Sequence, residues 1–169
     1  MRRVSAPADR LVVIGAGASS LVLDLVDAGY QTIEAVDISA AALDQLRERL
    51  GHRTGTVRLT RADALEVDHD TPVVVWHDRA VFHFLTDPAD QAAYARRAAG
   101  AVEPAGWLVI ATFSPAGPEQ CSGLRVARHS AESLAAVFGE FELVESFERD
   151  HETPWGASQR FTHALMRRR

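Results

Sequence analysis

Two glycines and two aspartates have the types and spacing of a nucleoside-binding site. Gly15 and Gly17 stand between a short apolar run and a helical pattern. Glycines at such a junction let the backbone turn tightly near a ligand, and the helix that follows presents free N–H groups. Asp37 comes 20 residues after Gly17, the spacing at which a carboxylate accepts ribose hydroxyls. Asp63 follows the next apolar run and adds a second carboxylate.

These residues also have ordinary structural interpretations. The glycines could form only a tight turn, and Asp37 could cap the helix that follows it. In an open α/β sheet, however, the carboxyl ends of parallel strands meet in one crevice where ligands bind. The sequence therefore favours a nucleoside-containing cofactor held by residues from three consecutive strands.

Apolar runs alternate with helical patterns along the chain, which predicts the parallel α/β sheet that such a site needs. A final pair of strands at 142–147 and 160–166 has no helix between them, so five strand–helix units end in an antiparallel hairpin. Residues 77–85 are expected to form a loop or short helix, 103–106 a turn, and 114–124 a long loop. We expect strands at 11–14, 32–36, 56–60, 73–76 and 107–113. We expect helices at 19–28, 39–51, 88–99 and 130–138, and the second and fourth of these begin at the N-caps Ser39 and Ser130.

The composition limits the function further. A chain of 169 residues predicts one domain, 1–169, since domains span roughly 100–200 residues. The net charge of −5 argues against nucleic-acid binding, and the absence of lysine excludes Schiff-base chemistry by this chain. A single cysteine and seven histidines without ligand spacing predict no metal site. No apolar run is long enough to span a membrane, so we expect a soluble cytoplasmic protein.

The glycine segment, Asp37, Asp63 and the terminal hairpin resemble class I S-adenosylmethionine-dependent methyltransferases. Residues 76–87, with the sequence WHDRAVFHFLTD, are similar to a largely uncharacterised bacterial branch of that superfamily. The segments 111–113, 117–119 and 121–124 add to this similarity, which extends from Leu11 to about Arg167. The resemblance implies a Rossmann-like fold with a mostly parallel sheet and S-adenosylmethionine as cofactor.

The resemblance also implies a role for individual residues. Gly15 and Gly17 would pass the methionine part of the cofactor, and Asp37 would hold the ribose hydroxyls. The adenine would lie beside Ile38 and Ala64, with its amino group bound by Asp63. Trp76, His77 and Asp78 would follow the fourth strand and face the sulfonium and the methyl acceptor.

Several side chains have alternative interpretations. His77 and Asp78 could act as a base and its orienting group, whereas Asp78 could instead pair with Arg79 or cap the next helix. Cys121 and His129 could form a thiolate–imidazole pair, although a buried thiol is the ordinary alternative. Phe82, His83 and Phe84 could line an acceptor pocket or pack under the sheet. Trp155, in the final hairpin, could fold over the site or belong to a packed turn.

Two departures from the family pattern bear on activity. Val13 stands where such enzymes carry an acidic residue, and only Met1–Arg10 precede the first strand, without the usual lid helices. We therefore expect an exposed apolar strip beside the pocket, covered by a second copy or a partner subunit. The leading prediction is a methyltransferase that acts on a small metabolite or a protein side chain.

Two other functions remain open. A non-catalytic binding module with the methyltransferase fold would fit the same departures. A nicotinamide-dependent oxidoreductase is the other alternative. It would require a third glycine where Ser19 stands and further βαβ units.

Overall fold

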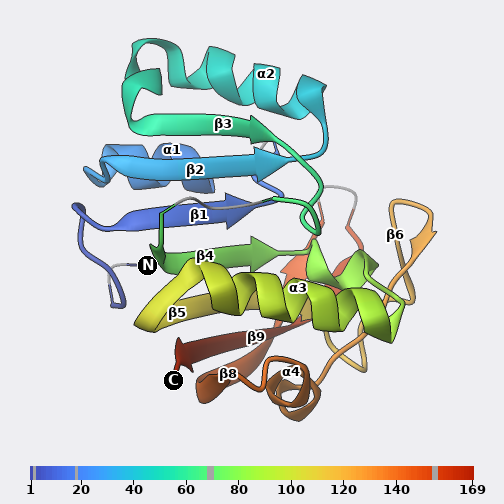
Figure 1. Ribbon diagram of the computed structural model, residues 1–169. Helices are drawn as coiled ribbons and strands as arrows, with labels where there is room; N and C mark the ends of the chain where they lie inside the picture. Colours follow the sequence, from blue (N-terminus) through green and yellow to red (C-terminus); the bar gives the residue numbers. More distant parts are fainter. Residues whose placement is uncertain (2, 18, 68–70, 154–155) are drawn as a thin grey trace.

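The computed structural model describes residues 1–169 except 2, 18, 68–70 and 154–155. Seven strands form one sheet in the order β3-β2-β1-β4-β5-β9-β8 (Figure 1). The first five are parallel: β1 (Arg10–Ile14), β2 (Thr32–Asp37), β3 (Val57–Arg61), β4 (Val73–Arg79) and β5 (Val102–Phe113). β9 (Ser158–Arg168) runs antiparallel to both of its neighbours, β5 and β8 (Phe141–Glu152). This arrangement confirms the predicted Rossmann-like fold with a C-terminal antiparallel hairpin.

The helices begin where polar side chains cap them. Ser39 accepts a hydrogen bond from the Ala42 amide at 3.2 Å, and Ser130 accepts one from the Ser133 amide at 3.2 Å, as the sequence predicts for both caps. Asp87 caps the third helix through the Ala89 amide. The helices are α1 (Leu21–Asp27), α2 (Ala40–Leu50), α3 (Pro88–Ala101) and α4 (Ala131–Val137), with short 3-10 turns η1 (Gly51–Thr56) and η2 (Phe82–Phe84).

The helices cover the two faces of the sheet unequally. On one face, α3 and α4 bury a large core that includes Trp76, Tyr94 and Phe138 (Figure 1). On the other face, α1 and α2 pack on the first strands around Val13 and Leu46. Over β8 the side chain of Phe147 remains 51% exposed, and it stacks on His163 of β9 with ring centroids 4.7 Å apart. The second face is thus left partly open over the C-terminal strands.

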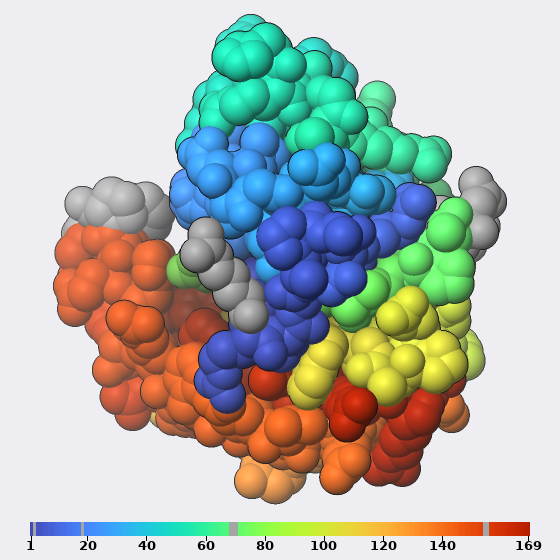
Figure 2. Space-filling view, turned by 90° about the vertical axis from the view of Figure 1, so that its left-hand side faces the viewer, coloured from blue at the N-terminus to red at the C-terminus, as the bar shows by residue number. Residues whose placement is uncertain are grey.

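The N-terminal residues lie along this open face. Arg3 forms an ion pair with Glu145 of β8, with Nη2 and Oε2 2.8 Å apart. Figure 2 shows the N-terminal residues (blue) against β8 (orange), with the surface hollowed beside them. A groove of about 240 Å³ lies here, and Val4, Phe147 and His163 are among the residues that line it.

Several elements differ from the sequence prediction. β4 extends to Arg79 because it pairs on both sides, Asp78 with Ile14 of β1 and Arg79 with Ala111 of β5. β5 begins at Val102 and includes the expected turn at 103–106. A small hairpin of β6 (Gln120–Cys121) and β7 (Leu124–Arg125) forms within the expected loop. The described residues between β3 and β4 hold no helix, so four strand–helix units precede the final hairpin instead of five.

The two final strands are also longer than predicted, 12 and 11 residues. Their polar outer residues pair across the hairpin, as Asp150 does with Arg160. Apolar and polar residues do not alternate regularly in the outer parts of β8 and β9, so sequence periodicity could not predict this extra length. No helix in the described part of the chain is long and apolar enough to cross a membrane.

Candidate active site

A cavity of about 530 Å³ lies at the carboxyl ends of β1, β2 and β3. Its volume falls in the range of roughly 300–1,000 Å³ that is usual for small-molecule sites. Five of the seven residues predicted to bind the cofactor line it: Gly15, Asp37, Ile38, Asp63 and Ala64. These residues come from three separate strand ends, so the fold brings together what the sequence spacing predicted.

Gly15 and Gly17 form a close turn above β1. Both have positive φ, +64° and +44°, which side chains rarely adopt. A Cβ on Gly15 would lie 2.1 Å from Cγ2 of Val81, which also lines the cavity. A Cβ on Gly17 would lie 3.3 Å from Oδ2 of Asp37. The glycines therefore allow the loop to pack against both walls of the cavity.

Asp37 makes the local hydrogen bond that its structural interpretation predicts. Its Oδ1 accepts from the Ser39 amide at 2.8 Å. Its Oδ2 lies on the side of Gly17. Asp63 behaves similarly, with Oδ1 accepting from the Leu65 amide at 2.8 Å. Each carboxylate is thus oriented by one backbone amide while its residue lines the cavity.

Apolar side chains surround the mouth of the cavity. Ile38 is 66% exposed, and Leu124 of β7 is 61% exposed. Val81, Phe84 and Leu85 line the cavity from the segment after β4. No role was predicted for Leu124, because its place depends on where the β6–β7 hairpin folds back. Leu124, like Val81, Phe84 and Leu85, nevertheless lies in a segment that carried the family resemblance.

Trp76 and Asp78 correct the prediction for the end of β4. Both lie within the strand rather than after it, both are fully buried, and neither lines the large cavity. Trp76 donates from Nε1 to the Tyr94 hydroxyl at 3.0 Å. They point into the α3 side of the sheet because alternate strand residues face opposite sides.

The Asp78 carboxylate anchors the segment that follows β4. It accepts from the Val81 amide at 3.0 Å, from the Phe82 amide at 3.1 Å and from the Tyr94 hydroxyl. These bonds hold the start of η2, whose N-cap residue is Val81, so Asp78 anchors the short helix from outside it. Burial raises the pKa of Asp78 to about 6, and these three hydrogen bonds oppose the rise. Asp78 therefore positions Val81, one wall of the cavity.

His77 faces the opposite side of β4 and lines a second cavity of about 310 Å³. Burial lowers the pKa of His77 to about 4, helped by the positive charges of the N-terminus and Arg79. The imidazole is therefore neutral at pH 7, and its Nδ1 has no hydrogen-bond partner among the described residues. The second cavity shares Ile14, Gly15, Arg79 and Ala80 with the first, so the two adjoin.

The remaining candidates from the sequence lie in packed surroundings. His129 bonds Ser133 through Nδ1, and its ring packs on Phe82 with centroids 5.2 Å apart. Cys121 is half-buried and packs against the cluster that contains Phe113. The ring of His83 is buried between Phe84 and Phe113. Trp155 lies outside the described residues, and within them no group of acidic, cysteine or histidine side chains could hold a metal.

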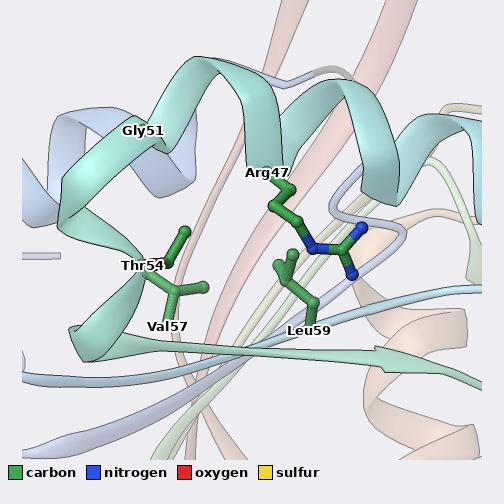
Figure 3. A pocket seen from close by; sticks show the side chains of 5 residues that line it. All are labelled: Arg47, Gly51, Thr54, Val57 and Leu59. Carbon is green, nitrogen blue, oxygen red and sulfur yellow. The ribbon is translucent and has the colours of Figure 1, made fainter.

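A further hollow of about 470 Å³ lies between α2 and the edge strand β3 (Figure 3). Arg47 extends from the helix over Leu59, beside Thr54 and Val57. Arg47 is paired with Asp44 on its own helix. None of the residues that line this hollow belongs to the predicted site, so we assign it no function.

Comparison with known proteins identifies the family. The family model described as "Methyltransferase domain" matches residues 12–106, more than half of the chain. The chain belongs to this methyltransferase family. The match confirms the family that the sequence predicted and, with it, an S-adenosylmethionine-dependent class of enzyme. It does not favour the non-catalytic alternative.

Solved structures share the fold of this methyltransferase along almost its whole length. A SAM-dependent methyltransferase from Methanosarcina mazei has a TM-score of 0.81 and 16% identity, covering 99% of this chain and 95% of that one. The N-methyltransferase NodS from Bradyrhizobium japonicum, in complex with S-adenosylhomocysteine, has a TM-score of 0.76 and 16% identity over 95% of this chain and 79% of that one. A 1,6-didemethyltoxoflavin-N1-methyltransferase from Burkholderia thailandensis has a TM-score of 0.75 and 20% identity over 95% and 71%.

A curated mouse protein, named eEF1A lysine and N-terminal methyltransferase, is 36% identical over 62 residues. This stretch covers 37% of the present chain and only 9% of the mouse protein. The methyltransferase described here therefore corresponds to a small part of that relative.

Proposed function

We propose that this chain transfers a methyl group from S-adenosylmethionine to a small molecule, at the junction of its two cavities. The observation that carries the proposal is the convergence of Gly15, Asp37 and Asp63 on one cavity that adjoins a second. Two solved relatives are named for N-methyl transfer, one of them with 1,6-didemethyltoxoflavin bound. The mouse relative is named for a protein substrate, but it matches only 62 residues.

The first cavity has the hydrogen-bond acceptors and apolar surfaces that the cofactor requires. Asp37, oriented by the Ser39 amide, would accept the ribose hydroxyls through its other oxygen. Ile38 and Ala64 would lie against the adenine, and Asp63 would accept from its amino group. Gly15 and Gly17 would leave room for the methionine part, since a Cβ on Gly15 would overlap Val81 and a Cβ on Gly17 would crowd the Asp37 carboxylate.

Bound there, S-adenosylmethionine supplies a methyl group activated by its positive sulfur. The chain has to hold an acceptor in line with that methyl group and keep water away. The buried imidazole of His77, with its pKa lowered to about 4, is neutral and a weak base at pH 7, so it would orient the acceptor by a hydrogen bond, and the proton that leaves the acceptor would go to solvent. Asp78 would act as a positioning residue through Val81 and Phe82.

The surface around the site and the composition of the chain support proposals for its partner, its acceptor and its location. Ile38 and Leu124 expose apolar side chains at the cavity mouth, which supports a second copy or a partner subunit covering it. The net charge of −5 supports an acceptor other than nucleic acid. A single half-buried cysteine is compatible with the reducing cytoplasm that we propose as its location.

Calorimetric titration tests the cofactor assignment. We expect S-adenosylhomocysteine to bind and NAD to show no heat under the same conditions. Asp44→Ala is the matched control for Asp37→Ala, because Asp44 is an exposed aspartate on α2 that pairs with Arg47. This control should leave the binding of S-adenosylhomocysteine unchanged. Binding of NAD at equal affinity, or no binding of S-adenosylhomocysteine to the folded protein, would contradict the proposal.

A further inference from the structure

The second cavity is the part of the site to which no ligand has been assigned. Its lining combines apolar side chains, Val13 and Leu21, with the polar groups Arg79, His77, His151 and Gln159. It adjoins the cofactor cavity across Gly15 and Arg79. A molecule in it would therefore stand beside the cavity proposed for the cofactor.

Arg79 is the charged group of this cavity, and its guanidinium is available to bind a ligand. The guanidinium has no ion pair or hydrogen bond to any residue that the structure describes. Its Cζ lies 5.8 Å from the ring centroid of Phe161, a cation–π contact that holds the side chain over β9. A guanidinium in such a place presents paired N–H donors that match a carboxylate or phosphate.

No carboxylate that the structure describes forms an ion pair with this guanidinium. The lining of the second cavity includes no Asp or Glu, whereas the cofactor cavity includes Asp37 and Asp63. On β8, Glu145 is engaged by Arg3 and Asp150 by Arg160. The pKa of His163 is lowered by burial and by the positive charges of Arg79 and Arg149, so both guanidinium groups act on its ring.

The polar neighbours of Arg79 would complete an anion site. His151 of β8 pairs in register with Gln159 of β9, so both side chains lie on the same face of the hairpin. The ring of His151 packs edge-on to Phe161, with centroids 6.3 Å apart. Phe161 thus orders the arginine and the histidine together, and Gln159 adds amide donors beside them.

We propose that the methyl acceptor is a small anionic molecule, a carboxylic acid with an apolar or aromatic body, whose charge is bound by Arg79. His151 and Gln159 would add hydrogen bonds, and the apolar part would lie along Val13, Leu21 and Phe161. This inference rests on the proposed function, because it takes the adjoining cavity as the cofactor site. Arg79 also lines that cavity, so the carboxylate of the cofactor itself is the competing ligand for this residue.

The test uses binding to the complex of the full chain with saturating S-adenosylhomocysteine. The probes are matched pairs of acids and amides, beginning with benzoate and benzamide and extending to two-ring acids and their amides. Affinity is measured by ligand-observed NMR titration. We expect at least one acid to bind about tenfold or more tightly than its amide. Arg79→Gln should abolish that preference, and Arg79→Lys should restore part of it.

Arg58→Gln serves as the control, since Arg58 is an exposed arginine on β3. The variant should keep the acid preference. Titration of S-adenosylhomocysteine alone into Arg79→Gln should change its Kd by less than about threefold. The inference is overturned if Arg79→Gln binds S-adenosylhomocysteine much more weakly and the wild-type chain shows no preference for acids over amides. That result would assign Arg79 to the cofactor.

Equal binding of acids and amides across the panel would also overturn it. Failure of the proposed function gives a different result, because the wild-type chain would then not bind S-adenosylhomocysteine at all. The two failures are therefore distinguishable in the first titration.

Discussion

Alanine at Gly15 should both destabilise the fold and damage the cofactor cavity. The residue has φ +64°, and an added Cβ would lie 2.1 Å from Cγ2 of Val81. The left-handed conformation costs an alanine about 1–2 kcal/mol. The overlap adds about 1–3 kcal/mol, the usual cost of overpacking. Val81 cannot simply retreat, because its amide is bound to the buried Asp78 carboxylate. We expect a total loss of about 2–5 kcal/mol.

Gly29→Ala separates the two contributions. Gly29 also has a positive φ, +88°, but a Cβ there would meet nothing within 4 Å. It should therefore cost only the conformational part, about 1–2 kcal/mol. Urea denaturation of both variants gives the difference, which measures the overlap with Val81.

A double-mutant cycle provides the decisive comparison. Val81→Ala removes the overlapping methyl group and leaves its Cβ 3.6 Å from the new side chain, an ordinary contact. The double variant Gly15→Ala/Val81→Ala should be more stable than the sum of the single effects predicts, by about 1–3 kcal/mol. If Gly15→Ala costs no more than Gly29→Ala, or if the cycle shows no coupling, the assigned packing is wrong.

Three further predictions concern single side chains. Asp37→Ala should weaken S-adenosylhomocysteine binding by roughly 1.5–3 kcal/mol in calorimetric titration, the range for a hydrogen bond to a charged group, and unchanged affinity would contradict the ribose assignment. Tyr94→Phe should lower the free energy of unfolding in urea by about 1–3 kcal/mol, since it deprives the buried Asp78 carboxylate of a donor; a neutral effect would show that this bond contributes nothing. Burial lowers the pKa of His83 to about 4, below the ordinary 6.5, so its contribution to stability is present above pH 6.5 and is lost as the pH falls through 4. His83→Leu should reduce the loss of stability between pH 7 and pH 4 by up to about 3 kcal/mol, and an unchanged pH profile would contradict the buried, neutral imidazole.

The glycine segment and its carboxylates show why part of the site was predictable. Gly15, Asp37 and Asp63 each end or follow a strand, and strand ends can be located from short apolar runs. Once the strands are parallel, their carboxyl ends must share one edge, so these residues must meet. No long-range information beyond the direction of the strands is needed.

The end of β4 shows what local patterns could not predict. The apolar run stops at Trp76, but the strand continues to Arg79 because β1 and β5 pair with it from both sides. The extension places His77 and Asp78 on opposite faces of the sheet. One lines a cavity and the other is buried beneath Tyr94. Adjacent residues predicted to work together are therefore separated by the sheet itself.

The sequence by itself determined the elements that depend on near neighbours: the helix caps Ser39 and Ser130, the apolar strands, and the glycine turn before α1. Tertiary structure alone decided the strand order and the meeting of His151, Gln159 and Arg79 at one cavity. Arg79 and His151 are 72 positions apart, and they meet only because β9 inserts between β5 and β8. Capping and periodicity are set by contacts within a few residues, whereas cross-strand register depends on which distant segments pair.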